Sequence, residues 1–102
     1  MSIRKRFLKS KPVCKVTFKL PKQVAGEAKT VCLAGEFNGW DTTATQMEKL
    51  KGGGFSVTLD LETGRAYQFR YLVDGERWEN DSEADGYVPS EYPDAENCIV
   101  EV

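Results

Sequence analysis

The chain has 102 residues, of which 40% are hydrophobic and 29% are charged, and its formal net charge is −2. This length holds one domain with one hydrophobic core, and the composition excludes a disordered chain. No histidine occurs in the sequence, so the commonest general base and the commonest metal ligand are both missing. We therefore expect a domain that is not an enzyme and that carries no metal and no other cofactor.

The charges are divided unevenly along the chain. Residues 1–51 carry 11 Lys and Arg against 4 acids, whereas residues 52–102 carry 3 against 12. Residues 1–12 are a short basic segment without a nucleic-acid-binding motif, which predicts a solvated tail and no nucleic-acid partner. The apolar runs are only a few residues long and no signal peptide is apparent, so we expect no membrane partner and a cytoplasmic location.

The first two strands are predicted on either side of a polar connection. Residues 13–20 alternate between apolar and polar side chains, which is typical of a half-buried strand. Pro21 ends this strand because proline cannot donate to a ladder. Residues 22–29 form the polar connection, and the short, almost wholly apolar segment 30–35 predicts a central strand.

Residues 37–47 predict an irregular loop that contains the first tryptophan. Asn38-Gly39 is a turn dipeptide, and Trp40 follows it directly. We expect Phe37 to fill the end of the core and Asn38 to hold the turn. Two interpretations remain for Trp40: its ring either anchors the loop on the end of the domain or offers an apolar face to a flat partner such as a sugar.

Two further strands are predicted after the glycines at 52–54, at residues 55–61 and 66–73, with a hairpin connection between them. A final strand is predicted at residues 97–102. Alternation along these strands gives the expected inner face, which consists of Cys14, Val16, Phe18, Leu20, Phe55, Val57, Leu59, Leu61, Tyr67, Phe69, Tyr71, Val73, Cys98, Val100 and Val102.

The Asp-Gly pair at 74–75 is the strongest hairpin signal in the chain, and it decides where the second tryptophan points. With a two-residue loop, Trp78 lies opposite Tyr71 on the core face. With a three-residue loop, Trp78 lies opposite Leu72 on the outer face, beside Arg70. The sequence leaves both registers open.

Residues 79–96 predict a long, acidic, ordered loop with one short strand near Tyr87 and Val88. Tyr87 and Tyr92 either cap the core or extend an aromatic platform. The acids of this loop are expected to form a solvated run without a catalytic role; they are Glu79, Asp81, Glu83 and Asp85.

The sequence has three cysteines, which are Cys14, Cys32 and Cys98. Each lies in a strand-like segment, and no two of them form a C-x-x-C motif. An odd number of cysteines argues against a secreted disulfide framework, so we expect buried free thiols. No segment has the length and period of a substantial helix. Six to eight short strands separated by turn signals predict an all-β protein, an antiparallel β-sandwich.

Residues 31–41, 55–61, 67–78 and 97–102, taken in order, resemble the family-48 carbohydrate-binding module. This family includes the amino-terminal early-set domains of isoamylases and glycogen branching enzymes, and the glycogen-binding domain of the AMP-activated protein kinase β subunit. The resemblance covers residues 13–102, a single domain. It implies an immunoglobulin-like sandwich that binds α-1,4-linked glucan such as glycogen or starch without catalysis.

The resemblance also implies a set of site residues. Trp40 occupies the position of a tryptophan that stacks on a glucose ring, and Arg70 stands where the family often has a lysine that reaches sugar hydroxyls. Trp78 matches a second stacking tryptophan, apart from one extra residue after the turn. An asparagine before the last strand contacts hydroxyls, for which Asn97 is the nearest candidate and Glu96 the alternative.

We therefore expect an α-glucan partner bound through Trp40, Arg70, Trp78 and Asn97. The rival hypothesis is an interaction module without glucan affinity of its own. Such a module would dock through a sheet face or through the acidic loop onto another protein, such as a glycogen-metabolising enzyme.

Overall fold

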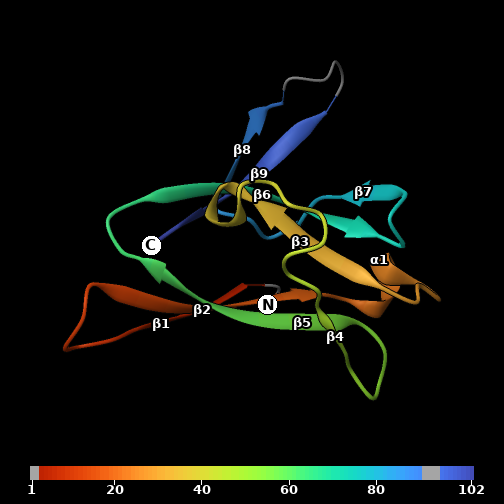
Figure 1. Cartoon of the computed structure of the whole chain (residues 1–102), viewed down its shortest axis with the longest axis horizontal. Coiled ribbons are helices and arrows are strands. Elements are labelled where there is room, and N and C mark those ends of the chain that lie inside the picture. The colour runs from red at the N-terminus through yellow and green to blue at the C-terminus, as the bar shows by residue number, and fades with distance from the viewer. Residues whose placement is uncertain (1–2, 91–94) are drawn as a thin grey trace.

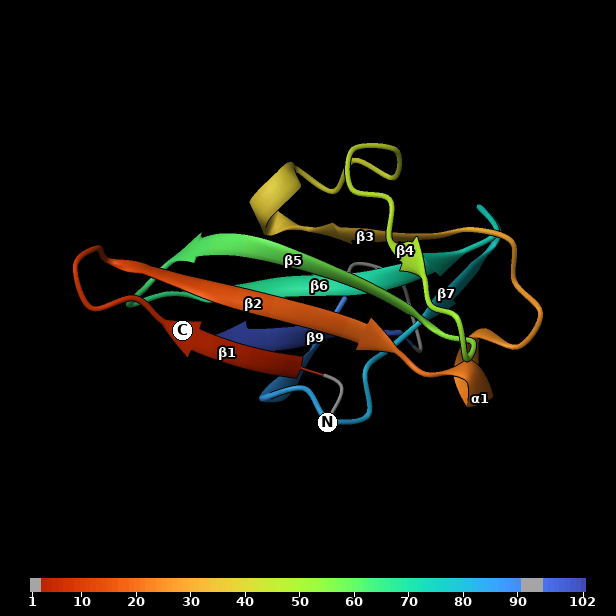
Figure 2. The same ribbon diagram turned by 90° about the horizontal axis from the view of Figure 1, so that it is seen from below.

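The fold is a sandwich of two antiparallel sheets, as Figures 1 and 2 show in two perpendicular views. The computed structural model describes residues 3–90 and 95–102, and nine strands lie within these ranges. The first sheet has the order β1 (Ile3–Phe7), β2 (Val13–Leu20), β5 (Phe55–Glu62) and β4 (Glu48–Lys49). The second has the order β3 (Val31–Gly35), β6 (Ala66–Val73), β9 (Glu96–Glu101) and β8 (Gly86–Pro89), with β7 (Arg77–Glu79) also paired to β6.

Helical structure is confined to two short segments in the described residues. The helix α1 (Lys22–Ala25) lies in the predicted polar connection, and the 3₁₀ helix η1 (Glu36–Asn38) follows β3. The described part of the chain contains no helix that is long and apolar enough to cross a membrane. The prediction of an all-β sandwich is confirmed.

Strand β1 differs from the solvated tail that was expected for the basic N-terminal segment. It pairs antiparallel with β2 along its whole length, and Ile3 is 8% exposed within the core. Ile3 faces inward because it lies opposite the buried Phe18 of β2. The neighbouring Arg4 and Arg6 are exposed, so the basic side chains are solvated even though their backbone is a strand. The sequence did not predict this strand, because its five residues have apolar side chains only at the two ends, which is too short a pattern to show alternation.

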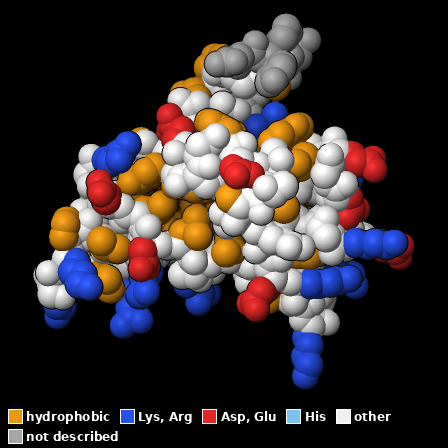
Figure 3. Space-filling model, viewed as in Figure 1, with side chains coloured by type: hydrophobic (Ala, Val, Ile, Leu, Met, Phe, Trp, Pro, Cys, Tyr) orange, Lys and Arg blue, Asp and Glu red, His pale blue; other side chains and the backbone are white. Residues whose placement is uncertain are grey.

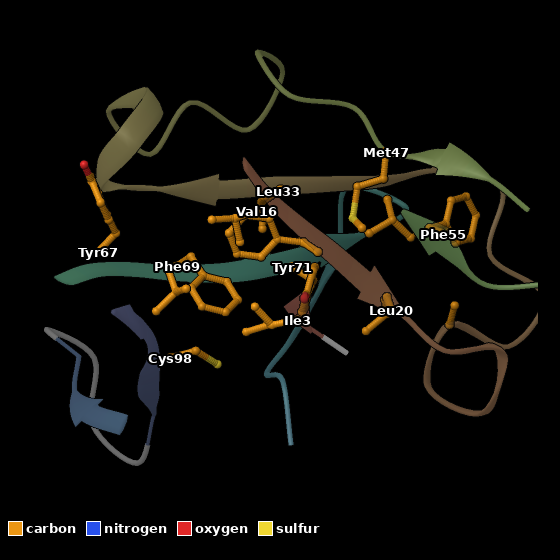
Figure 4. Close-up of a cluster of buried hydrophobic side chains, with 14 of the residues drawn as sticks. Ile3, Val16, Leu20, Leu33, Met47, Phe55, Tyr67, Phe69, Tyr71 and Cys98 are labelled. Carbon is orange, nitrogen blue, oxygen red and sulfur yellow. The ribbon is translucent and has the colours of Figure 1, made fainter. Parts of the chain in front are cut away.

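The core lies between the two sheets and is built by the side chains that alternation assigned to it. Figure 4 shows Val16 and Leu20 of β2 in one cluster with Phe69 and Tyr71 of β6. The Phe69 ring centroid lies 5.0 Å from that of Phe18 and 5.7 Å from that of Tyr71, both edge-on. All fifteen side chains predicted to face inward belong to this cluster or pack against it. The partly buried Phe37 packs on Phe18, so its predicted place at the core end is confirmed.

Strand β6 is the centre of its sheet. One edge pairs with β3, whereas the other edge pairs with β9 at residues 66–69 and with β7 at residues 71–73. Strands β7 and β9 therefore follow one another along the same edge. The outer face of this sheet carries every second residue of β6, starting at Ala66.

The turn between β6 and β7 contains three residues, Asp74, Gly75 and Glu76. The pairing of Val73 with Arg77 and of Leu72 with Trp78 fixes this register. Asp74 and Gly75 both have positive φ, of 53° and 69°, which explains why Asp-Gly occurs here. Of the two registers left open by the sequence, the structure has the one that places Trp78 on the outer face.

Phe69→Ala should lower the free energy of unfolding by about 3–5 kcal/mol, because it removes a fully buried ring and leaves a cavity in a close-packed core. Urea denaturation monitored by circular dichroism measures the change. The matched control is Phe7→Ala, since Phe7 is 57% exposed; its cost should stay within about 0.5 kcal/mol. Equal costs for the two substitutions would contradict the assignment of Phe69 to the core.

Candidate functional site

An open groove of about 850 Å³ crosses the outer face of the second sheet. The structure brings together in it all four residues proposed from the sequence, which are Trp40, Arg70, Trp78 and Asn97. Among the residues that the structure describes, the others that line it are Glu36, Thr42, Gln68, Pro89, Ser90 and Ala95. Strands β9 and β7 follow one another along one edge of β6, and the β8 and β9 hairpin rises beside β6 in Figure 1. On the other edge, β3 leads into the loop that carries Trp40.

Trp40 is held at the rim of the groove by the turn before it. The Asn38 side chain accepts a hydrogen bond from the Gly35 N–H (3.1 Å) and donates to the Leu33 carbonyl (2.8 Å) and the Thr45 hydroxyl (3.0 Å). The Trp40 N–H donates to the Gly35 carbonyl at 2.8 Å. These bonds close the loop around Asn38, so the predicted role of Asn38 in holding the turn is confirmed.

The backbone of Trp40 lies in the left-handed region, with φ of 62°. This conformation is costly for a bulky residue and persists only where the surrounding structure imposes it. The outcome is an indole that is 36% exposed and faces the groove. A strained residue of this kind is a candidate for a functional role.

The floor of the groove is made by polar side chains on the outer face of β6 and β9. The Asn97 amide donates to Gln68 Oε1 at 3.1 Å, which links the two strands across the floor. The Glu36 carboxylate accepts a hydrogen bond from the Gln68 N–H at 2.7 Å, so the start of η1 is tied to β6. Asn97 lines the groove, whereas Glu96 is exposed beside it and does not.

Arg70 lies between the floor and the second tryptophan. Its guanidinium carbon is 5.6 Å from the centroid of the Trp78 ring, within the range of a cation–π contact. Its Nε donates to Asn80 Oδ1 at 2.7 Å. In residues 3–90 and 95–102, no carboxylate forms an ion pair with Arg70, and Glu79 instead pairs with Arg77 at 3.2 Å.

Beneath the groove, the buried Asp81 fixes the start of the acidic loop. Its side chain is bonded by the Tyr71 hydroxyl (2.8 Å) and the Glu83 N–H (2.8 Å), and its carbonyl accepts from the Tyr87 hydroxyl. Burial, and then the Asp81 charge, raise the pKa of Tyr71 well above its ordinary value, so the phenol remains a neutral donor. Burial likewise raises the pKa of Cys98 to about 11, and this thiol accepts from the Asp81 N–H at 3.1 Å.

These contacts correct the prediction that the whole acidic run is solvated. Asp81 is only 3% exposed, because a buried tyrosine hydroxyl and a backbone amide together replace its water shell. Asp85 also has a partner, since its Oδ2 forms an ion pair with Lys5 Nζ at 2.6 Å. Nothing in the sequence pattern separates Asp81 from its acidic neighbours.

The structure also places Tyr87 and the three cysteines. Tyr87 is 42% exposed and bonds the acidic loop, and it does not line the groove; Tyr92 lies outside the described residues. Cys14 and Cys98 are buried free thiols as predicted, whereas Cys32 is only partly buried on the outer face. No cluster of three or more potential metal ligands occurs in the described ranges.

Sequence reasoning missed Gln68 and Asn80, and it gave Glu36 no firm role. Gln68 could have been found, because it lies two residues before Arg70 and therefore on the same face of β6. Asn80 could not, since its contacts reach β6 and β9 from a position just after β7.

The fold is a two-sheet β-sandwich, and its groove combines exposed aromatic rings with polar groups, a surface that suits a sugar ring. A family model described as the glycogen recognition site of AMP-activated protein kinase matches residues 9–97. The chain belongs to this family, as its motifs implied. Membership supports carbohydrate binding, and glycogen recognition in general, as its function, and modules of this kind are typically non-catalytic. No curated protein matches the chain at a significant level.

The indole of Trp78 should be open to solvent in the folded protein, since it is 39% exposed. In a Trp40→Phe variant, which leaves Trp78 as the single tryptophan, iodide should quench the native fluorescence readily. A blue-shifted emission that iodide does not quench would contradict the outer-face register. The reciprocal Trp78→Phe variant gives the comparison for Trp40.

Tyr71→Phe should lower the free energy of unfolding by about 1–3 kcal/mol, because it leaves a buried carboxylate short of one donor. Chemical denaturation measures the loss. Tyr67→Phe is the matched control, since the Tyr67 hydroxyl donates to the Glu62 carbonyl at a part-buried site. A Tyr71→Phe variant no less stable than Tyr67→Phe would contradict the role of Asp81 as an anchor.

Proposed function

We propose that the chain binds α-1,4-linked glucan, such as glycogen or starch, in the groove on the outer face of the second sheet. The observation that carries this proposal is that two exposed indoles, Trp40 and Trp78, line one groove together with Arg70 and the linked amides Gln68 and Asn97. Family membership supports the same conclusion.

The proposed mechanism combines ring stacking with hydrogen bonds. A glucose unit has apolar C–H faces and hydroxyls at its edges, so it requires a flat aromatic surface with polar groups around the rim. Trp40 and Trp78 supply the surfaces. Arg70 and Asn97 supply donors, and the Glu36 carboxylate at the groove wall supplies an acceptor.

The proposed activity is binding without catalysis. Glycoside hydrolysis in most families requires two carboxyl groups facing each other across the scissile bond. Among the residues that line the groove in the described part of the chain, Glu36 is the one carboxylate. Its hydrogen bond to the Gln68 N–H fits a structural and binding role.

A second candidate function is docking onto another protein, such as a glycogen-metabolising enzyme. The outer face of the first sheet, opposite the groove, favours it. Arg4 and Arg6 are exposed there on the edge strand β1. Phe7, which is 57% exposed, ends the same strand, in the row of side chains that starts with Ile3. Figure 3 shows Lys and Arg side chains gathered along the part of the molecule formed by this sheet. A bifunctional module would use one face for glucan and the other for a protein.

Native gel electrophoresis with glycogen in the matrix tests the glucan proposal. The wild-type chain should be retarded, and Trp40→Ala should weaken the affinity by about tenfold, in line with the cost of removing one stacking ring. Phe7→Ala is the control, because it removes an exposed ring far from the groove. A wild-type chain that migrates equally with and without glycogen would refute the proposal.

The same variants separate the two candidate functions. Co-purification of a protein that is lost with Phe7→Ala and kept with Trp40→Ala would support docking through the first sheet. Retardation by glycogen in both the wild type and Phe7→Ala would support the groove.

A further inference from the structure

Arg70 lies at a break along one edge of β6. On this edge, β9 pairs with β6 as far as Phe69, and β7 pairs with it from Tyr71 onward. Arg70 thus stands where one neighbouring strand ends and the next begins. Asn80 follows β7 directly, and it is placed to bridge this break.

Both ends of the Asn80 side chain are used in the bridge. Its Oδ1 accepts from Arg70 Nε at 2.7 Å, and its Nδ2 donates to the Glu96 carbonyl at 3.0 Å, at the first residue of β9. Asn80 is partly buried, and it is absent from the residues that line the groove. It therefore reaches the site only through its neighbours.

We infer that Asn80 is the positioning residue of the glucan site, and that it acts by fixing Arg70 over Trp78. This inference rests on the proposed function. With Nε held by Asn80, the guanidinium stays at 5.6 Å from the Trp78 ring centroid and its two terminal nitrogens remain as the donors for sugar hydroxyls. Arg70 and Trp78 then form one composite platform.

The gain from this arrangement is pre-organisation. A free arginine side chain has many rotamers, and ordering one at the moment of binding weakens the affinity. The Asn80 bond and the Trp78 ring restrict those rotamers before the sugar arrives. Since neutral Asn80 brings no charge, the positive charge of Arg70 also stays uncompensated by an ion pair in the described part of the chain.

A double-mutant cycle on the full chain tests the inference, with maltoheptaose affinity measured by calorimetry and the melting temperature measured in parallel. Asn80→Ala should weaken binding by about tenfold, as expected for a lost hydrogen bond to a charged group. In the Arg70→Ala background, the same substitution should change affinity by less than about twofold, because its target is gone. In the Trp40→Ala background, it should keep its full effect.

Asn80→Asp separates the two hydrogen bonds of Asn80. It keeps an acceptor for Arg70 Nε and loses the donor to the Glu96 carbonyl. Binding should therefore stay within about threefold of the wild type, since a charged acceptor holds the guanidinium at least as well, while the melting temperature falls. A residue with only a structural role would lose affinity and stability together in both variants.

The outcomes distinguish this inference from the proposed function. Unchanged affinity in Asn80→Ala, or an equal loss with and without Arg70, overturns the inference and leaves glucan binding standing. A wild-type chain that does not bind maltoheptaose overturns both. A slowly exchanging Arg70 Nε–H resonance that is lost only in Asn80→Ala, together with the non-additive cycle, supports it.

Discussion

Strand β6 builds both the core and the groove, because its alternate side chains point to opposite faces of one sheet. Tyr67, Phe69 and Tyr71 face inward and pack in the core, whereas Gln68 and Arg70 face outward and line the groove. The two sets cannot move independently, since they share one backbone. Packing of the aromatic core therefore fixes the height and spacing of the polar groups on the floor of the site.

The two edges of β6 bring the rest of the groove to this floor. Strand β3 leads directly into the turn that carries Trp40, and β7 and β9 meet end to end beside Arg70 to deliver Trp78 and Asn97. The junction is held from below by the Tyr71 to Asp81 hydrogen bond and from the side by Asn80. Two buried or part-buried polar contacts thus connect β6 to the chain just after β7. Hydrogen bonds of this kind contribute most to stability where water is excluded, because a buried polar group without a hydrogen-bond partner raises the free energy of the folded state.

The proposed function requires a small domain to recognise a polar polymer. A sugar has no charge to attract, so affinity depends on flat apolar contact and on hydroxyl partners that are already in place. Trp40 is held by a turn and Trp78 lies against a guanidinium, so both rings are restrained before a ligand binds. The opposite sheet presents exposed basic side chains instead, which gives the domain two faces of different chemistry.

The sequence by itself determined the sandwich class, the inner face of each predicted strand and the family, because period-two alternation and short turn motifs are local signals. It also placed Trp40 in its loop and Arg70 on an outer face. The tertiary structure alone decided the side of Trp78, since a single residue in the turn after β6 reverses the face of every residue in β7. It alone revealed β1 as a strand, Asp81 as buried and Asn80 as a bridge, because each depends on a partner in another element, which the local pattern does not identify. Local pattern fixes which way a side chain points along its own strand, and only the packing of strands fixes what it meets there.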